Sequence, residues 1–366
     1  MNFSHFLNSK KIIVTLIYAV FLAFSTAKAS AVQDSTVRLE AEKTKNEKEF
    51  NPSETILEHI ADSHYIHFGG DSYMALPVIL FTDKGLECFS SGKLDHGKQT
   101  FKGKYYTYAL VDDKVNVVDD SGNKTPGKTI FNFKGHFTDL SITKNIVSLW
   151  LSIIVLLIAF LSVASAYKKT VGKAPRGFQS FIEPVIMFVR DDIAIPNIGY
   201  KYQRFMPLLL TVFFFIWINN LIGLVPFFPG GANLTGNIAV TLVLSVVTLL
   251  VVNFNGNKHY WKHIFFPGDV PIWLWPLWWV VELLGIFSRP FALMIRLFAN
   301  ITAGHIIVLS LISLIFVFKA AAVSIVSVPF VVFMDVLELL VALLQAFIFT
   351  LLTALFIGTA VEEHHH

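Results

Sequence analysis

The chain has 366 residues, of which 54% are hydrophobic and only 15% are charged. Soluble domains carry about 25% charged residues, so a protein that folds entirely in water is excluded. The charged residues are also distributed unevenly, because 31 lie within residues 30–145 and only 21 within residues 146–366. We therefore expect a polar segment large enough for a small soluble domain, followed by a membrane-embedded segment.

The N-terminus has the pattern of a secretory signal peptide. Lys10 and Lys11 precede an apolar run over residues 12–24, and residues 27–29 have the A-x-A form of a cleavage site. An uncleaved transmembrane helix is the alternative, but at about 1.5 Å per residue the run is too short to cross about 30 Å of hydrocarbon. We therefore predict a signal peptide over residues 1–29 and a mature chain that begins outside the cytoplasm.

Residues 30–136 are predicted to form a periplasmic extension with a small, strand-containing domain. Residues 30–50 are rich in Glu and Lys, which indicates a flexible leader. Residues 52–68 favour a short helix capped by Ser53. Runs typical of strands follow at Leu76–Thr82, Lys104–Leu110, Val115–Val118 and Thr129–Phe133, with a hairpin turn over residues 119–123 between the last two.

The extension offers few groups for chemistry. Cys88 is the single cysteine, so an intramolecular disulfide is excluded. His59, His64 and His67 are potential metal ligands, but their spacing matches no known site, so surface or interface histidines are the favoured interpretation. The sequence contains no Gly-rich phosphate loop and no basic–aromatic surface. We expect no cofactor, no bound metal and no nucleic-acid partner.

The apolar segments predict an α-helical polytopic membrane protein, with a membrane domain over residues 137–366. The expected spans are about five, at residues 146–166, 205–227, 238–254, 276–318 and 320–360. About 20 residues suffice to cross a bilayer, so the last two segments are unusually long. Two long oblique helices joined near Lys319 are the favoured interpretation, with re-entrant pairs or spans with interfacial extensions as open alternatives.

The basic residues predict the orientation. Residues 167–204 carry seven Lys or Arg residues, whereas the loop at 228–236 carries no charge. The positive-inside rule then places the first loop in the cytoplasm, the N-terminal domain in the periplasm and the C-terminus in the cytoplasm of a bacterium, with the spans in its inner membrane. Within the basic loop, residues 178–189 have loose helical amphipathicity, which predicts a helix on the membrane surface.

Ionisable and amide side chains interrupt the last two apolar segments. They are Glu282, Arg289, Arg296, Asn300, His305, Asp335, Glu338 and Gln345. A charge at mid-membrane costs roughly 2.5–3.5 kcal/mol on insertion scales, so such groups mark ion pathways by default. Snorkelling at the end of a span accounts for Arg289 and is an open alternative for Glu282. It does not fit four residues that have apolar sequence on both sides, namely Arg296, His305, Glu338 and Gln345.

Helical geometry assigns these groups to faces. At about 100° per residue, Arg296 and Asn300 share a face, whereas His305 points elsewhere. On the other segment, one narrow stripe contains Asp335, Glu338, Ala342 and Gln345. Small residues that permit close helix approach are Ala299, Ala303 and Gly304. A permanently charged arginine beside an ionisable His and Glu is what a proton path requires.

Three motifs lie in the membrane domain. They are S-R-P-F-A-L-M-I-R-L-F-A-N-I-T-A-G-H over residues 288–305, L-E-L-L-V-A-L-L-Q-A-F-I-F-T over residues 337–350, and N-L-I-G-L-V-P over residues 220–226. Together they closely resemble subunit a of F-type ATP synthases. The resemblance covers roughly residues 137–363, and the extension over residues 30–136 goes beyond the usual core of the family.

The resemblance implies a non-catalytic, proton-conducting stator subunit, whose partners are the c-ring, the peripheral-stalk b subunits, membrane lipid and, indirectly, the F1 ATPase. Arg296 would face the carboxylates of the rotating c-ring. Asn300 and Gln345 would be its neighbours at that interface.

The same resemblance implies two offset half-channels. His305 and Glu338 would line the outer one, and Asp335 is grouped with them on the polar stripe. Many bacterial members carry an acid at the first position and a histidine at the second, so the two residue types are exchanged here while the pair is kept. Glu282 and Ser288 are candidates for the half-channel on the cytoplasmic side.

Two other classes of protein are alternatives to this assignment. An ion-coupled secondary transporter with a periplasmic domain often contains internal repeats or broken helices, and the sequence shows no repeat. A membrane-embedded hydrolase with His305 and Glu338 as acid and base would lack a nucleophile or metal constellation. Both classes are disfavoured relative to the stator subunit.

Overall fold

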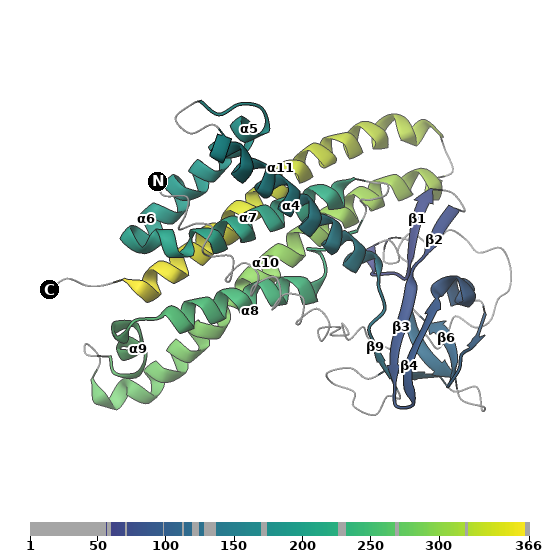
Figure 1. Ribbon diagram of the computed structural model, residues 1–366, viewed down its shortest axis with the longest axis horizontal. Helices are drawn as coiled ribbons and strands as arrows, with labels where there is room; N and C mark the ends of the chain where they lie inside the picture. Colours follow the sequence, from purple (N-terminus) through teal and green to yellow (C-terminus); the bar gives the residue numbers. More distant parts are fainter. Residues whose placement is uncertain are drawn as a thin grey trace.

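The computed structural model comprises a β domain and a helical membrane part joined through helix α4 (Figure 1). The residues it describes are Ile56, 60–69, 72–97, 99–111, 113–118, 124–127, 137–169, 174–225, 232–267, 271–318 and 321–362. Five sequence predictions lie outside these residues, namely the signal peptide over 1–29, the leader over 30–50, the Ser53 cap, the turn over 119–123 and the strand Thr129–Phe133.

The described part of the β domain contains nine strands and a 3-10 helix, η1. They are β1 (Tyr65–Gly69), β2 (Ser72–Ala75), β3 (Pro77–Thr82), β4 (Gly85–Ser90), η1 (Ser91–Gly97), β5 (Phe101–Lys102), β6 (Thr107–Val111), β7 (Lys114–Val118), β8 (Lys124–Pro126) and β9 (Phe137–Asp139). All pairings are antiparallel, in a β1-β2 hairpin, a β4-β3-β9 sheet and a β5-β6-β7-β8 sheet. Their common core includes Val78, Leu80, Tyr108 and Phe137, all fully buried.

The β domain confirms part of the sequence prediction. Strands β3 and β7 match two predicted runs, and β6 overlaps the C-terminal half of a third. The predicted helix over residues 52–68 is wrong at its C-terminal end, where Tyr65–Gly69 forms β1. Tyr65 and Ile66 are buried and pair with β2, so tertiary pairing overrides local helical preference. The final strand, β9, pairs with β3 beyond the predicted boundary at residue 136.

The helical part contains five helical segments long and apolar enough to cross a membrane, in agreement with the five predicted spans. Their elements are α4 (Lys144–Lys169), α5 (Phe178–Phe188), η2 (Val189–Ala194), α6 (Ile195–Ile198), η3 (Gly199–Lys201), α7 (Tyr202–Leu224), α8 (Ile238–Asn255), η4 (Ile272–Leu274), α10 (Trp275–Phe318) and α11 (Ala321–Val361), with the short helix α9 (Lys258–Phe265) between α8 and η4. Residues 178–188 are helical as predicted, and their position on the membrane surface stays a prediction.

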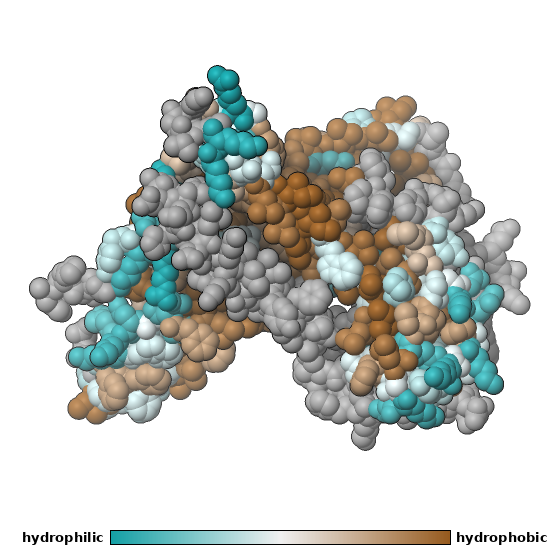
Figure 2. Space-filling view, viewed as in Figure 1, coloured by the Kyte–Doolittle hydropathy of each residue, from teal (hydrophilic) through white to brown (hydrophobic). Residues whose placement is uncertain are grey.

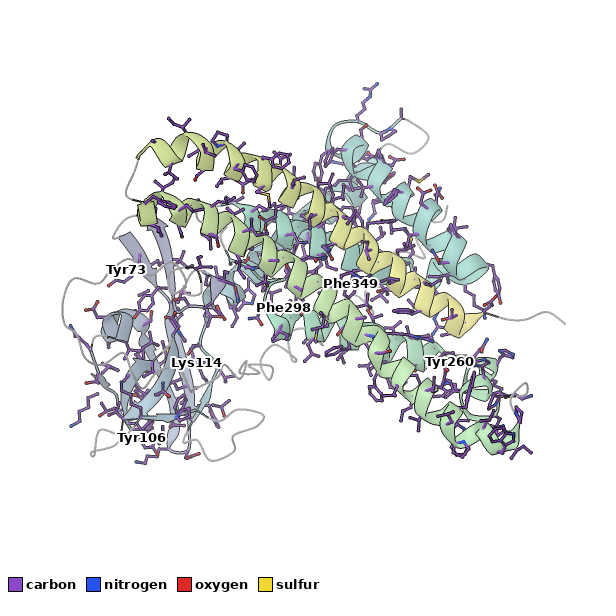
Figure 3. All side chains as sticks on the ribbon, turned by 180° about the vertical axis from the view of Figure 1, so that it is seen from behind. Tyr73, Tyr106, Lys114, Tyr260, Phe298 and Phe349 are labelled. Atoms are coloured by element: carbon purple, nitrogen blue, oxygen red, sulfur yellow. The ribbon has the colours of Figure 1, made fainter. Side chains whose placement is uncertain are left out.

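Helices α10 and α11 are single, long helices of 44 and 41 residues. Both continue through an internal proline, Pro290 and Pro329, so the described residues contain no re-entrant break in either. They run side by side and pack against α7 and α8 (Figures 1 and 3). Two long helices were the favoured prediction for this region, and the structure agrees with it.

Helix α7 is the centre of the membrane part. Leu209, Phe213 and Ile216 are fully buried, and α7 contacts both α4 and α11. The outer surface of the bundle is apolar, and Figure 2 shows hydrophobic side chains gathered over the helices while hydrophilic ones lie on the β domain and at the opposite end of the molecule. Such a belt is expected of helices solvated by lipid.

Hydrogen bonds fix the C-terminal end of α11. Asn257 N donates to Ala360 O at 2.9 Å, and Lys201 Nζ donates to Val361 O at 3.3 Å. A cation at the C-terminus of a helix satisfies free carbonyl groups and complements the helix dipole. The end of α11 is therefore held by the segments that precede α7 and α9.

Candidate functional site

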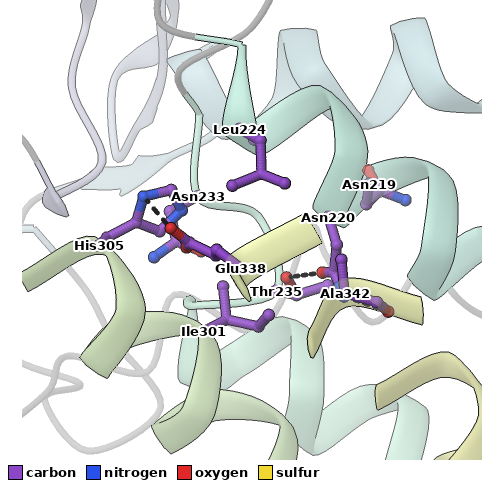
Figure 4. A pocket seen from close by; sticks show the side chains of 10 residues that line it. Asn219, Asn220, Leu224, Asn233, Thr235, Ile301, His305, Glu338 and Ala342 are labelled. Carbon is purple, nitrogen blue, oxygen red and sulfur yellow. Dashed lines mark hydrogen bonds and ion pairs between the residues drawn. The ribbon is translucent and has the colours of Figure 1, made fainter. Parts of the chain in front are cut away.

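The centre of the site is a His–Glu pair between the two long helices. His305 Nδ1 on α10 lies 3.7 Å from Glu338 Oε1 on α11 (Figure 4). The side chain of His305 is 20% exposed and that of Glu338 only 7%. Gly304 makes room for the carboxylate, because a Cβ atom there would lie 2.8 Å from Glu338 Oε1. The absence of a side chain at one position thus lets the acid approach the histidine.

The pair lines a small pocket that has room for about one water molecule. Its lining residues come from α7, the segment before α8, α10 and α11, namely Asn219, Asn220, Gly223, Leu224, Asn233, Thr235, Ile301, His305, Glu338 and Ala342. Thr235 Oγ1 donates to Asn220 Oδ1 at 2.5 Å, and Asn220 Nδ2 donates to Ala342 O at 3.4 Å. These bonds link the segment after α7 to α11 and hold the pocket together (Figure 4).

Three buried polar atoms around the pocket have no hydrogen-bond partner among the described residues. They are Asn219 Oδ1, Asn233 Nδ2 and Glu338 Oε1. Leaving a buried donor or acceptor unpaired costs about 1–3 kcal/mol, which a purely structural core would avoid. A cavity lined by several such atoms is suited to water and to protons that pass along it.

Arg296 and Asn300 lie on a different face of α10. Both side chains are exposed, whereas Leu293, Leu297 and Ile301 are buried. Within the part of the chain that the structure describes, Arg296 forms no ion pair or hydrogen bond. The predicted shared face of Arg296 and Asn300 is confirmed, and it points away from the rest of the chain.

The polar stripe of α11 points inward for most of its length. Glu338, Ala342 and Gln345 are buried, as is Phe349 one turn further along (Figure 3), whereas Asp335 is exposed. The structure therefore brings Glu338 together with His305. It buries Gln345 on the inner face of α11, and no hydrogen bond among the described residues joins Gln345 to the exposed Arg296.

The two candidates for the cytoplasmic side lie near the start of α10. Ser288 is exposed and its Oγ donates to Gly285 O at 3.2 Å. Glu282 is half-buried close to Tyr260 of α9. Burial raises the pKa of Tyr260, the Arg289 guanidinium lowers it and the Glu282 carboxylate raises it. A second pocket at this end includes Arg289 and Tyr260 but neither Glu282 nor Ser288 in its lining.

Sequence reasoning missed part of the pocket. Asn219, Asn233 and Thr235 were not singled out, and Asn220 entered only as part of a motif. For Asn219 the sequence does contain a signal, because Asn219 and Asn220 are adjacent asparagines inside an apolar span. Such residues are costly in a membrane unless they face a polar cavity. Of the three histidines considered as metal ligands, His64 is buried in the β domain, where its carbonyl accepts hydrogen bonds from Leu76 N and Ser91 Oγ. His59 and the side chain of His67 lie outside the described residues.

The fold and the site define a multi-pass helical membrane protein with an ionisable pair in a polar pocket and an exposed arginine on an adjacent face. Comparison with known proteins narrows this class. The family model for the ATP synthase A chain matches residues 146–358, and a domain of unknown function matches residues 55–140.

Curated relatives agree with the family match. ATP synthase subunit a of Chloroherpeton thalassium is 47% identical over 234 residues, which is 62% of this chain and 69% of the relative. ATP synthase subunit a 2 of Chlorobaculum tepidum is 48% identical over 61% of this chain and 64% of the relative. A subunit a of Chlorobium phaeobacteroides is 45% identical over 74% of this chain and 78% of the relative. The chain belongs to the ATP synthase subunit a family.

Membership of this family supports the role of a proton-conducting stator subunit. It does not support a secondary transporter. The β domain lies largely outside the family match, which begins at residue 146.

Proposed function

We propose that this chain provides two offset half-channels through which protons reach and leave the carboxylates of a c-ring. The observation that carries the proposal is the division of α10 into two functional faces. His305 faces Glu338 at 3.7 Å in the polar pocket, and Arg296 is exposed on another face. A subunit that passes protons to a moving partner needs one face that conducts protons, here with His305 and Glu338, and another that contacts the partner, here with Arg296.

The outer half-channel runs past the His–Glu pair. An imidazole gains and loses a proton near neutral pH, and a carboxyl group can do so where its surroundings favour the neutral form. The asparagines of the pocket supply hydrogen-bonding groups beside the pair. A proton that enters from outside passes His305 and Glu338 and neutralises a c-ring carboxylate. The neutral site then moves into lipid, where an ionised one would be strongly disfavoured.

Arg296 separates the two half-channels. Its guanidinium remains protonated in proteins, so it stabilises the ionised carboxylate of the c-ring and cannot pass a proton directly. Asn300 lies on the same exposed face, and Gln345, which is buried on α11, is expected to support this face from within the helical bundle. Each charge that crosses 100 mV supplies about 2.3 kcal/mol, so several protons act together for each ATP.

The inner half-channel opens near Glu282 and Ser288, where the c-ring carboxylate loses its proton to the cytoplasm. Asp335 is exposed on α11, about one turn before Glu338, and belongs to the outer side. In this orientation the β domain is periplasmic and the C-terminus of α11 is cytoplasmic, in a bacterial inner membrane.

The chain contributes no catalytic residue, because ATP forms on the peripheral F1 ATPase. Its partners are the c-ring and the peripheral-stalk b subunits, and it contacts F1 only indirectly. Purification of the tagged full chain from its native membrane tests this assignment. Co-purification of a ring of small hydrophobic subunits and a peripheral ATPase is expected, whereas a chain that purifies without them would contradict the proposal.

A further inference from the structure

The β domain passes into the membrane part without a flexible linker. After β9, Leu140 N donates to Ile79 O at 2.9 Å, and Ile142 N donates to Pro77 O at 3.2 Å. Strand-like hydrogen bonding to β3 therefore continues to residue 142, and α4 begins at Lys144. The position of the β domain is consequently coupled to the start of α4.

The β domain also caps α4. Lys144 N donates to Ser63 O at 2.9 Å, and Asn145 N donates to Asp62 Oδ1 at 3.1 Å. These bonds satisfy two of the N–H groups that the start of a helix leaves free. Ser63 Oγ in turn donates to Asp113 Oδ1, at 3.4 Å, in the turn between β6 and β7. Two separate segments of the β domain thus meet at the first turn of α4.

This junction lies next to the outer proton site. The Lys144 ammonium group interacts electrostatically with Asp62 and Asp113 on the β-domain side and with His305 on the membrane side. The Lys144 ammonium group is therefore near enough to interact both with the acidic groups of the β domain and with His305.

One face of α4 is polar where it leaves the junction. Asn145, Ser148 and Ser152 are buried and fall on one side of the helix at spacings of three and four residues. The opposite side is apolar and exposed, with Trp150 42% and Ile154 53% accessible. A helix that only anchors a domain in lipid would not bury its polar side chains in this way.

Two of the polar groups at this junction are unpaired. Thr143 Oγ1 and Ser148 Oγ have no hydrogen-bond partner among the described residues, although these residues are only 3% and 2% exposed. They add two unpaired buried atoms at the junction to those that surround the pocket with Glu338. Polar groups left unpaired at such a cost are typical of a path that water occupies.

We propose that the junction between the β domain and α4 forms the outer entrance of the proton path. Asp62, Lys144 and Asp113 are the charged lining of its mouth, and the polar face of α4 leads from the mouth toward His305. The inference rests on the proposed proton path past His305 and Glu338, and it assigns to the β domain a direct part in proton access.

The test uses the complete ATP synthase complex with the full chain. Cys88→Ser removes the single natural thiol, and Ser148→Cys places one on the polar face of α4. Spheroplasts are treated from outside with a membrane-impermeant methanethiosulfonate that carries a trimethylammonium group. Inverted vesicles are then prepared, and ATP-driven proton pumping is measured with a fluorescent pH dye. Trp150→Cys is the matched control, because it lies on the exposed apolar face of the same helix.

Modification of Ser148→Cys is expected to abolish pumping, and a thiol reductant is expected to restore it, while treated Trp150→Cys complexes continue to pump. Thr143→Cys replaces Ser148→Cys if the latter does not assemble. A thiol at these positions that stays unmodified, or whose modification leaves pumping unchanged, would overturn the proposed entrance. Arg296→Ala complexes are measured in parallel. If they do not pump, the proton path stands and only the proposed entrance is overturned. If they pump, the proposed proton path itself is wrong.

Discussion

His305 Nδ1 lies 3.7 Å from Glu338 Oε1, so the two long helices meet through an ionisable pair inside the membrane part. Gly304 and Ala342, one on each helix, are the small residues that flank this contact in space. Residues of α7 and of the segment before α8 line the same pocket as the pair, and the His305 side chain is 20% exposed. The pair is therefore largely withdrawn from bulk solvent, and its chemistry depends mainly on the two side chains and the pocket amides.

The pair should tolerate reciprocal exchange better than loss of either member. His305→Glu alone places two carboxyl groups together, and Glu338→His alone places two imidazoles together, so each single change should sharply reduce ATP-driven proton pumping. The double variant restores one acid and one imidazole and should regain much of the activity. Pumping in inverted vesicles measures this, and a double variant no better than the singles would show that the two positions are not equivalent partners.

Gly304→Ala should displace the Glu338 carboxylate. The added Cβ would lie 2.8 Å from Glu338 Oε1, and the flexible end of that side chain can move away at little cost in stability. We expect normal assembly of the complex but reduced proton pumping. Unchanged pumping in assembled Gly304→Ala complexes would mean that the His–Glu distance does not matter.

Gly358→Ala should instead prevent correct packing of α11. A Cβ there would overlap the backbone carbonyl of Asn197 in α6, which cannot move as a side-chain end can. Overpacking of this kind costs about 1–3 kcal/mol or more. The level of assembled complex in the membrane is the measurement, and Gly285→Ala is the matched control because nothing lies within 4 Å of its added Cβ. Equal amounts of both complexes would contradict the observed α6–α11 contact.

Asp62→Ala should loosen the first turn of α4, whereas Asp62→Asn should not. Loss of a capping side chain costs about 0.5–2 kcal/mol, and Asn caps as well as Asp. Hydrogen exchange of the peptide that contains Lys144 and Asn145 measures the effect in the intact complex. Faster exchange is expected for Asp62→Ala alone, and equal exchange in both variants would mean that the bond from Asn145 N to Asp62 Oδ1 does not stabilise the helix.

The membrane helices were predictable because apolar length is set by bilayer thickness and the helical rise. The pairing of His305 with Glu338 was also implied by the motifs. The convergence of Asn219 and Asn233 on one pocket was not, because it depends on how α7 and the segment before α8 pack against the long helices, which no local pattern encodes.

The β domain was harder to predict for a different reason. Strand β4 contains Glu87, whose charge interrupts the apolar alternation of a strand. In the structure this carboxylate is buried and accepts hydrogen bonds from Tyr108 Oη, at 2.9 Å, and from Lys104 N. Burial and the Glu87 carboxylate raise the pKa of Tyr108, as expected for a phenol that donates inside a core. Only tertiary partners make such a strand stable.

The exposed position of Arg296 permits the most direct test of the account. Because its side chain has no partner among the described residues, Arg296→Ala should leave folding and assembly intact. Arg289→Ala is the matched control, since the Arg289 guanidinium packs over the Phe356 ring at 5.7 Å within the same chain. ATP-driven proton pumping by the purified, reconstituted complex is the measurement. The account predicts that Arg296→Ala abolishes pumping while Arg289→Ala retains it, and coupled pumping by Arg296→Ala complexes would contradict it.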